Sequence, residues 1–227
     1  MDQMVLYNIS VWALPVLFAI TLHEAAHGYA AFKLGDPTAY VLGRISLNPL
    51  RHVDFFGTIL VPLFLAFTHS PFLFGWAKPV PVDARKFKKP REQMALVAIA
   101  GPGVNIILAI ISALMMRVLH VMDGAFANWL MINFKNSLII NVILAVFNML
   151  PILPLDGGRV INGLLPRELA NRYEQTESYG FFLVIFLLLI LPMIGGAMGL
   201  NLNFVGAYIQ TVSAFIIDLI AILTGQS

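Results

Sequence analysis

The sequence predicts an all-α polytopic membrane protein with about five to six transmembrane helices, and its composition is the first reason. Of the 227 residues, 59% are hydrophobic and 11% are charged, whereas soluble proteins have about 45–50% apolar and about 25% charged residues. A soluble fold of this size needs a polar exterior that this chain does not have. Several apolar runs also reach the roughly 20 residues that cover the hydrocarbon core. The lipid bilayer is therefore the expected environment.

The remaining composition excludes several kinds of site. The formal net charge is only +2, so nothing suggests a nucleic-acid partner. The chain has no cysteine, which excludes disulfides, a thiolate metal site and a cysteine nucleophile. No feature of the sequence indicates an oligomeric state.

Each apolar run justifies one element. The first run, 5–32, carries His23, Glu24 and His27 in its C-terminal half. Later runs predict spans at 93–121, 134–157, 179–194 and 204–224, and a further apolar run covers 55–76. The loops between the runs are short and no repeat is present. We therefore expect one membrane-embedded domain over 1–227, with a core at 5–165 and additional C-terminal helices at 179–224.

The polar stretches predict other local structure. Tyr40-Val41-Leu42 favours a short membrane-associated β segment before Gly43. Residues 77–83 alternate proline with valine, which excludes a helix and favours an extended backbone. Either stretch is a candidate to pair with an unwound peptide as an added strand. Residues 159–178 predict an amphipathic helix at the membrane surface.

The basic residues predict how the chain crosses the membrane. Of 14 Lys and Arg residues, three lie at 33–53, six at 78–91 and three at 159–178. If 55–76 crossed the membrane, the basic residues would divide nine against five, whereas a re-entrant hairpin divides them twelve against two. Cytoplasmic loops carry the excess of Lys and Arg. We therefore expect a re-entrant hairpin at 55–76 and five spans, with the N-terminus outside and the C-terminus inside. A sixth span is the alternative.

The first span contains the pattern H-E-x-x-H. Residues four apart on a helix share a face, so His23 and His27 could bind one metal ion, with Glu24 beside it to take a proton from water. Zinc suits two imidazole nitrogens, one carboxylate oxygen and an open position. Chance is the alternative reading of the pattern. However, an acid buried in a bilayer costs about 2.5–3.5 kcal/mol on insertion scales, and a metal ion would stabilise Glu24 there.

A second polar cluster runs from Asn148 to Gly158. Pro151 and Pro154 break the helix, and broken backbone at membrane depth is tolerated only where it lines protein or a wet cavity. Asp156 is the natural third ligand of a His₂Asp site, and a helix-terminal cap is its alternative role. The hairpin brings this cluster and the histidines to the same side of the membrane, as a shared ion requires.

Together the two motifs resemble the site-2 protease family of intramembrane zinc metalloproteases. The resemblance covers roughly residues 15–165, and it is specific for the pair of motifs. The segments Gly101-Pro102-Gly103-Val104-Asn105 and Lys78-Pro79-Val80-Pro81-Val82 are also similar to segments of the family. We expect the compact form of the family, without a PDZ or CBS domain.

The resemblance implies an enzyme that cleaves transmembrane helices of single-span membrane protein substrates inside the bilayer. It implies that His23, His27 and Asp156 bind zinc and that Glu24 activates water. It also implies that Asn148 holds the substrate backbone, for which a hydrogen bond between helices is the alternative. The expected location is a prokaryotic cell (inner) membrane, with the active site towards the cytoplasmic side. The alternative function is a metal-ion or proton transporter that uses the same site.

Overall fold

The structure, a computed structural model, describes residues 3–60 and 77–226, and no β-strand occurs within them. Its elements are α1 (Gln3–Lys33), α2 (Thr38–Val41), η1 (Pro49–Arg51), η2 (Phe55–Leu60), η3 (Ala84–Lys86), α4 (Pro90–Leu119), α5 (Ala125–Asn148), α6 (Asp156–Leu164), α7 (Arg167–Glu174), α8 (Glu177–Ile185), η4 (Phe186–Ile190), α9 (Leu191–Ala197) and α10 (Phe204–Thr224). The all-α fold class is therefore confirmed.

Five helical stretches in the described residues are long and apolar enough to cross a membrane. They are Leu6–Lys33, Pro90–Leu119, Ala125–Asn148, Glu177–Ala197 and Phe204–Thr224. Their number agrees with the lower figure expected from the sequence. The expected surface helix at 159–178 is divided between α6, α7 and the start of α8.

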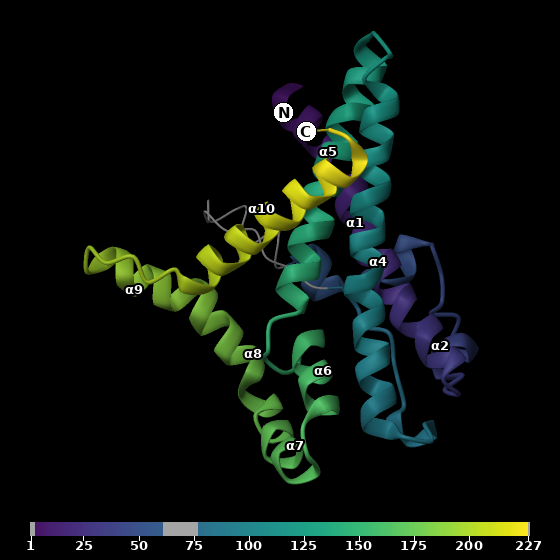
Figure 1. Ribbon diagram of the computed structural model, residues 1–227, viewed down its shortest axis with the longest axis vertical. Helices are drawn as coiled ribbons and strands as arrows, with labels where there is room; N and C mark the ends of the chain where they lie inside the picture. Colours follow the sequence, from purple (N-terminus) through teal and green to yellow (C-terminus); the bar gives the residue numbers. More distant parts are fainter. Residues whose placement is uncertain (1–2, 61–76, 227) are drawn as a thin grey trace.

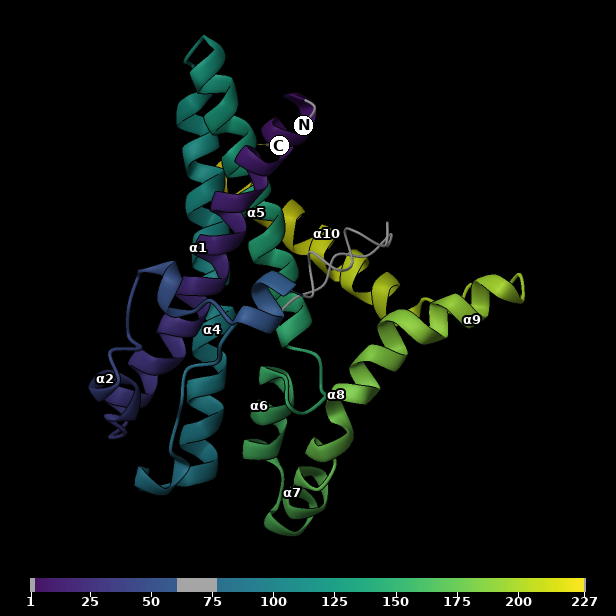
Figure 2. The same ribbon diagram turned by 180° about the vertical axis from the view of Figure 1, so that it is seen from behind.

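Helices α1, α4 and α5 form a bundle of three, with α6 packed against α4 and α10 against α5 (Figures 1 and 2). Small side chains dominate the contacts. Ala109 and Ala113 of α4 are almost fully buried and pack with Leu138 and Val142 of α5. Small residues let helix backbones approach closely, which is how helices associate where lipid removes the hydrophobic driving force.

A proline within α1 is compensated by α5. Pro15 has no N–H, so the carbonyl of Val11 lacks its usual helical donor. The Asn136 side chain donates a hydrogen bond to this carbonyl at 2.9 Å. Asn136 is buried. Its hydrogen bond links α5 to α1 at the turn where Pro15 leaves α1 without one of its own backbone hydrogen bonds.

The two flanks of the 55–76 run meet in the structure. The Lys78 backbone N–H donates to the carbonyl of His52 at 2.9 Å, and the Asp83 N–H donates to the Asp36 carboxylate. This contact is what a re-entrant hairpin requires of its flanks. Residues 55–60 form η2, but residues 61–76 lie outside the described ranges, so the hairpin itself stays a prediction.

The β segment expected at residues 40–42 is wrong. Thr38–Val41 form the single helical turn α2, because Asp36 before the segment and Gly43 after it favour a turn. The Asp36 side chain accepts a hydrogen bond from the Thr38 N–H at 3.0 Å and so starts the turn. Gly43 has φ 62°, which ends it. Tyr40 and Val41 favour strands because they pack well against a neighbouring strand, and no such strand occurs within residues 3–60 and 77–226.

A hydrogen bond between α4 and the end of α10 fixes the position of the C-terminus in the structure. Arg117 Nη1, near the end of α4, donates to the Thr224 carbonyl at 2.7 Å. Since α1 runs antiparallel to α4, both chain ends lie at the same end of the long axis (Figure 1). The five candidate spans are an odd number, as termini on opposite sides of a membrane require, so the expected sides of the two termini stay a prediction. Arg117 supplies a donor for a carbonyl that α10 leaves unpaired at its C-terminus. Helices α8 and α9 lead away from the bundle, and α10 returns to it (Figure 2).

Asp36 ties the loop after α1 to the segment before α4. Its side chain is fully buried and accepts hydrogen bonds from the Thr38 hydroxyl and from the Asp83 N–H, the latter at 2.7 Å. Lys86 Nζ lies 3.4 Å from Asp36 Oδ1. Burial alone would raise the pKa of Asp36, but the hydrogen bonds from Thr38, Asp83 and Lys86 outweigh it and hold the pKa below its ordinary value.

We expect Asp36→Ala to lower the free energy of unfolding by about 1–3 kcal/mol, because the partly buried N–H groups of Thr38 and Asp83 lose their acceptor. Since the pKa of Asp36 is lower in the folded state, its stabilisation is complete above pH ~4 and is lost as the pH falls further. Denaturation in detergent micelles from pH 3 to 7 measures both effects. Asp123→Ala, at an exposed loop, is the control. Equal stability of the two variants at pH 7 would contradict the prediction.

Candidate metal centre

The structure brings His23, His27 and Asp156 together. One ligand atom from each of the three lies within 4.8 Å of the others. The two Nε2 atoms of the histidines are 3.0 Å apart. Asp156 Oδ2 lies 3.3 Å from Nε2 of His23 and 3.4 Å from Nε2 of His27. Helix α1 supplies the imidazoles one turn apart, and the first turn of α6 supplies the carboxylate.

The outer nitrogen of each imidazole is fixed by α4. His23 Nδ1 is 2.6 Å from the side-chain oxygen of Asn105, and His27 Nδ1 is 2.8 Å from the carbonyl of Val97. Both partners are acceptors, so each Nδ1 carries a proton and donates it. In a neutral imidazole this leaves Nε2 with a free lone pair, which points towards Asp156. A metal-binding histidine is held by the same kind of hydrogen bond.

This geometry fits a zinc ion. Two Nε2 lone pairs and a carboxylate oxygen converge with no proton between them, and Asp156 Oδ2 has no hydrogen-bond donor among the described residues. In a tetrahedral site with ligand distances of about 2.0–2.1 Å, neighbouring ligand atoms are about 3.3 Å apart, close to the separations found here. The N-cap position of α6 is occupied by Leu155, so Asp156 is not the N-cap residue of this helix.

Glycines allow the three parts of the site to approach. A Cβ atom on Gly101 would lie 2.5 Å from Nε2 of His27 and 2.6 Å from Cε1 of His23. A Cβ atom on Gly158 would lie 2.5 Å from the backbone nitrogen of Leu153. Gly101 therefore lets α4 pack against the imidazoles, and Gly158 lets the first turn of α6 fold against the proline-rich turn before it.

Asn105 is the centre of a buried hydrogen-bond network that the sequence did not reveal. Its side-chain nitrogen donates to Asn141 Oδ1 at 2.7 Å and to the Ala19 carbonyl at 3.3 Å, which orients its oxygen towards His23. Asn105 and Asn141 are almost fully buried. The available signal was an asparagine four residues after Gly101, on the same face of an apolar helix.

The two other expected site residues have different surroundings. Glu24 Oε2 accepts a hydrogen bond from the Val80 N–H at 2.7 Å. The Asn148 side-chain nitrogen donates to the Leu144 carbonyl of its own helix at 3.0 Å. His52, in the loop before η2, is buried, and its Nε2 lies 2.9 Å from the Ser46 carbonyl.

The comparison with known proteins assigns the family. The "Putative zinc metalloprotease YwhC" of Bacillus subtilis is 41% identical over 202 residues, which cover 86% of this chain and 88% of the relative. The chain belongs to the site-2 proteases, peptidase family M50. The model of peptidase family M50 matches residues 113–191, a range that contains Asp156 and Asn148. The chain is thus a zinc metalloprotease.

More distant M50 relatives agree. Two proteins named "Putative zinc metalloprotease Rip2" are 28% identical over 174 residues in Mycolicibacterium smegmatis and 29% identical over 175 residues in Mycobacterium tuberculosis. The matches cover 76% and 75% of this chain and 64% of each relative. No solved structure matches the chain significantly.

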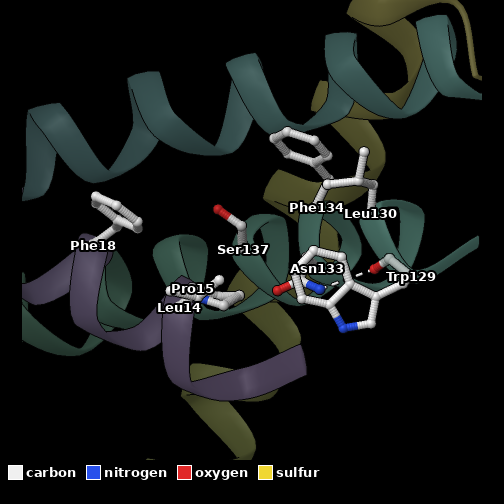
Figure 3. Close-up of a pocket in the computed structure, with 8 residues that line it drawn as sticks. All are labelled: Leu14, Pro15, Phe18, Trp129, Leu130, Asn133, Phe134 and Ser137. Atoms are coloured by element: carbon white, nitrogen blue, oxygen red, sulfur yellow. Dashed lines mark hydrogen bonds between the residues drawn. The ribbon is translucent and has the colours of Figure 1, made fainter. Parts of the chain in front are cut away.

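A separate cavity of about 200 Å³ lies between α1 and α5 of this M50 peptidase (Figure 3). Phe18 and Trp129 contribute to its mostly apolar lining, together with the polar residues Asn133 and Ser137. No residue of the metal centre lines it. The Ser137 hydroxyl is nevertheless linked to the centre, because Asn141 lies 3.3 Å from it and also contacts Asn105.

We expect Gly101→Ala to lower the zinc affinity of the M50 site at least about 10-fold, as loss of the groups that orient metal ligands does, because the added methyl group displaces both imidazoles. Zinc retention during dialysis against a chelator series measures this affinity. Gly103→Ala is the matched control on the same helix, since its Cβ atom would meet nothing within 4 Å. Equal retention in the two variants would show that the close contact is unimportant.

Proposed function

We propose that this zinc metalloprotease hydrolyses peptide bonds within transmembrane segments of single-span membrane proteins. One observation carries the proposal: three metal-ligand atoms converge where α1, a helix long and apolar enough to cross a membrane, meets the start of α6. A water-dependent site inside such a bundle is suited to a scissile bond that itself lies in the bilayer. Isolated acids and imidazoles at this depth are expensive, and they are typically functional.

The ligands of the zinc ion are His23, His27 and Asp156. When bound there, zinc supplies a Lewis acid that polarises the scissile carbonyl and lowers the pKa of a water molecule. Glu24 takes the proton of the attacking water and later delivers it to the leaving amine. Its place three residues before His27 supports this role, because residues three apart lie on the same face of a helix.

Asn148 has a role in substrate binding. It lies at the C-terminal end of α5, directly before the turn that leads to Asp156. Its Nδ2 donates within α5, which leaves the side-chain oxygen to accept a hydrogen bond from an extended substrate backbone. A substrate helix must unwind to expose such a backbone N–H, since helical amides are already paired.

The site faces the cytoplasmic side of a prokaryotic cell membrane. The basic stretches at 33–53, 78–91 and 159–178 flank the end of the bundle where the metal centre lies, and only Arg117 and Lys135 lie elsewhere. The positive-inside rule places this end in the cytoplasm. The matched relatives are bacterial, which supports a bacterial type of membrane.

Glu24→Gln should abolish cleavage and keep the metal. We expect cleavage of a single-span model substrate in liposomes to fall at least about 10²–10⁴-fold, the usual contribution of a general base, while zinc content is unchanged. His23→Ala is the companion variant and should lose zinc as well. Cleavage by Glu24→Gln at the wild-type rate would refute the protease proposal. Zinc transport into the same liposomes by both proteins would support a transporter instead.

Cysteine labelling tests the orientation, because the native chain has no cysteine. Lys88→Cys and Gln175→Cys lie at exposed positions near the metal centre's end of the bundle, and Asp123→Cys is exposed at the other end. In intact bacterial spheroplasts, a membrane-impermeant maleimide should label only Asp123→Cys. Labelling of Lys88→Cys but not of Asp123→Cys would reverse the proposed orientation.

A further inference from the structure

The segment at residues 77–83 is fixed at both ends. At its beginning, the Lys78 N–H donates to the His52 carbonyl at 2.9 Å, and Arg44 Nη2 donates to the Lys78 carbonyl at 2.7 Å. At its end, the Asp83 N–H donates to the buried Asp36 carboxylate at 2.7 Å. These hydrogen bonds hold an extended segment that has no helix or sheet of its own.

The middle of this segment presents one backbone donor to Glu24. Pro79 and Pro81 have no N–H, so Val80 provides the only N–H among these three residues. That N–H donates to Glu24 Oε2 at 2.7 Å. The Val80 side chain is 9% exposed, and a Cβ atom on Gly28 would lie 3.1 Å from its Cγ1. Val80 therefore sits closely against α1, one turn after Glu24.

We propose that the Val80 N–H is a positioning group that fixes the Glu24 carboxylate for proton transfer; this inference rests on the proposed role of Glu24 as the general base. A hydrogen bond to Oε2 stops rotation of the carboxylate and leaves Oε1 to accept the proton of the water. Because the acceptor is charged, this hydrogen bond is stronger than one between neutral groups. Fixed orientation is a recognised source of rate enhancement.

The anchors of the segment favour a permanent support over a displaceable cap. A cap that blocks Glu24 until substrate arrives would have to break the hydrogen bonds to His52, Arg44 and Asp36 or bend between them. The same hydrogen bonds occupy Lys78 N–H, Lys78 C=O and Asp83 N–H, so these groups are not free to pair with a substrate strand. Pro79 and Pro81 thus leave Val80 with an isolated N–H between them, and this N–H points at the base.

A pair of substitutions at position 80 separates the donor from the side chain. Val80→Pro removes the N–H, and Val80→Ala keeps it but removes most of the contact with Gly28. We expect Val80→Pro to lower kcat about 10- to 100-fold, as loss of a charge-assisted hydrogen bond would, with KM and zinc content unchanged. Val80→Ala and Val82→Pro should keep most of kcat. An equal loss in Val80→Ala, or a higher kcat in Val80→Pro, would overturn the proposal.

Hydrogen–deuterium exchange tests the contact without any activity and without a proline substitution. In a peptide that covers 79–82, only Val80 and Val82 carry amide protons. We expect one of them to exchange at least about 10-fold faster in Glu24→Ala, as loss of a protecting hydrogen bond implies. Glu24→Gln should keep the slow exchange, because its side-chain oxygen can still accept the hydrogen bond.

The exchange outcomes distinguish this inference from the proposed function. Equal exchange in wild type and Glu24→Ala would overturn the positioning role, even if Glu24→Gln proves inactive. Conversely, retained cleavage in Glu24→Gln refutes the general base, while slow exchange that depends on an acceptor at position 24 would still establish the contact.

Discussion

The convergence of three electron-pair donors between apolar helices is the constraint on which the rest of this structure depends. His23 Nε2, His27 Nε2 and Asp156 Oδ2 lie 3.0–3.4 Å apart. In a medium of low dielectric constant, their repulsion is large unless a cation lies among them. A divalent ion reverses the sign of the interaction. Because α1 and α6 are distant in sequence, binding of the ion also contributes to the free energy that holds these elements together.

This constraint explains the importance of α4, which supplies no ligand. Its Asn105 side chain and its Val97 carbonyl accept the Nδ1 protons of the two histidines, and this choice of tautomer frees both Nε2 atoms. The helix can do so only because Gly101 leaves room for the imidazoles. The ligand geometry therefore depends on three features of α4 together: the space at Gly101, the buried Asn105 amide and the Val97 carbonyl. A change in any of them alters the positions of the imidazoles.

The sequence predicted those features that are set by residue spacing and by charge. Helical periodicity placed His23 and His27 on one face, and the need for a third ligand in a broken helix pointed to Asp156. Features that arise from contacts between distant parts of the chain, or from several residues acting together, could not be predicted from the sequence. The helical turn at Thr38–Val41 depends on Asp36 and Gly43 acting together, which outweighs the local β propensity. The hydrogen bond from Arg117 of α4 to the Thr224 carbonyl of α10 is another such contact, and hydropathy carries no information about it.

Glu24 and its neighbouring histidines share one helical turn, yet different elements hold them. Helix α4 fixes the imidazoles, whereas the carboxylate is held from the 77–83 segment, whose own anchors are Arg44, His52 and Asp36. The ligands and the base can therefore be disturbed independently. The segment 77–83 makes these contacts through backbone N–H and C=O groups, so its role depends more on its backbone than on its side chains. The alternating prolines suit this role, because proline has no N–H and therefore determines which N–H groups the segment retains.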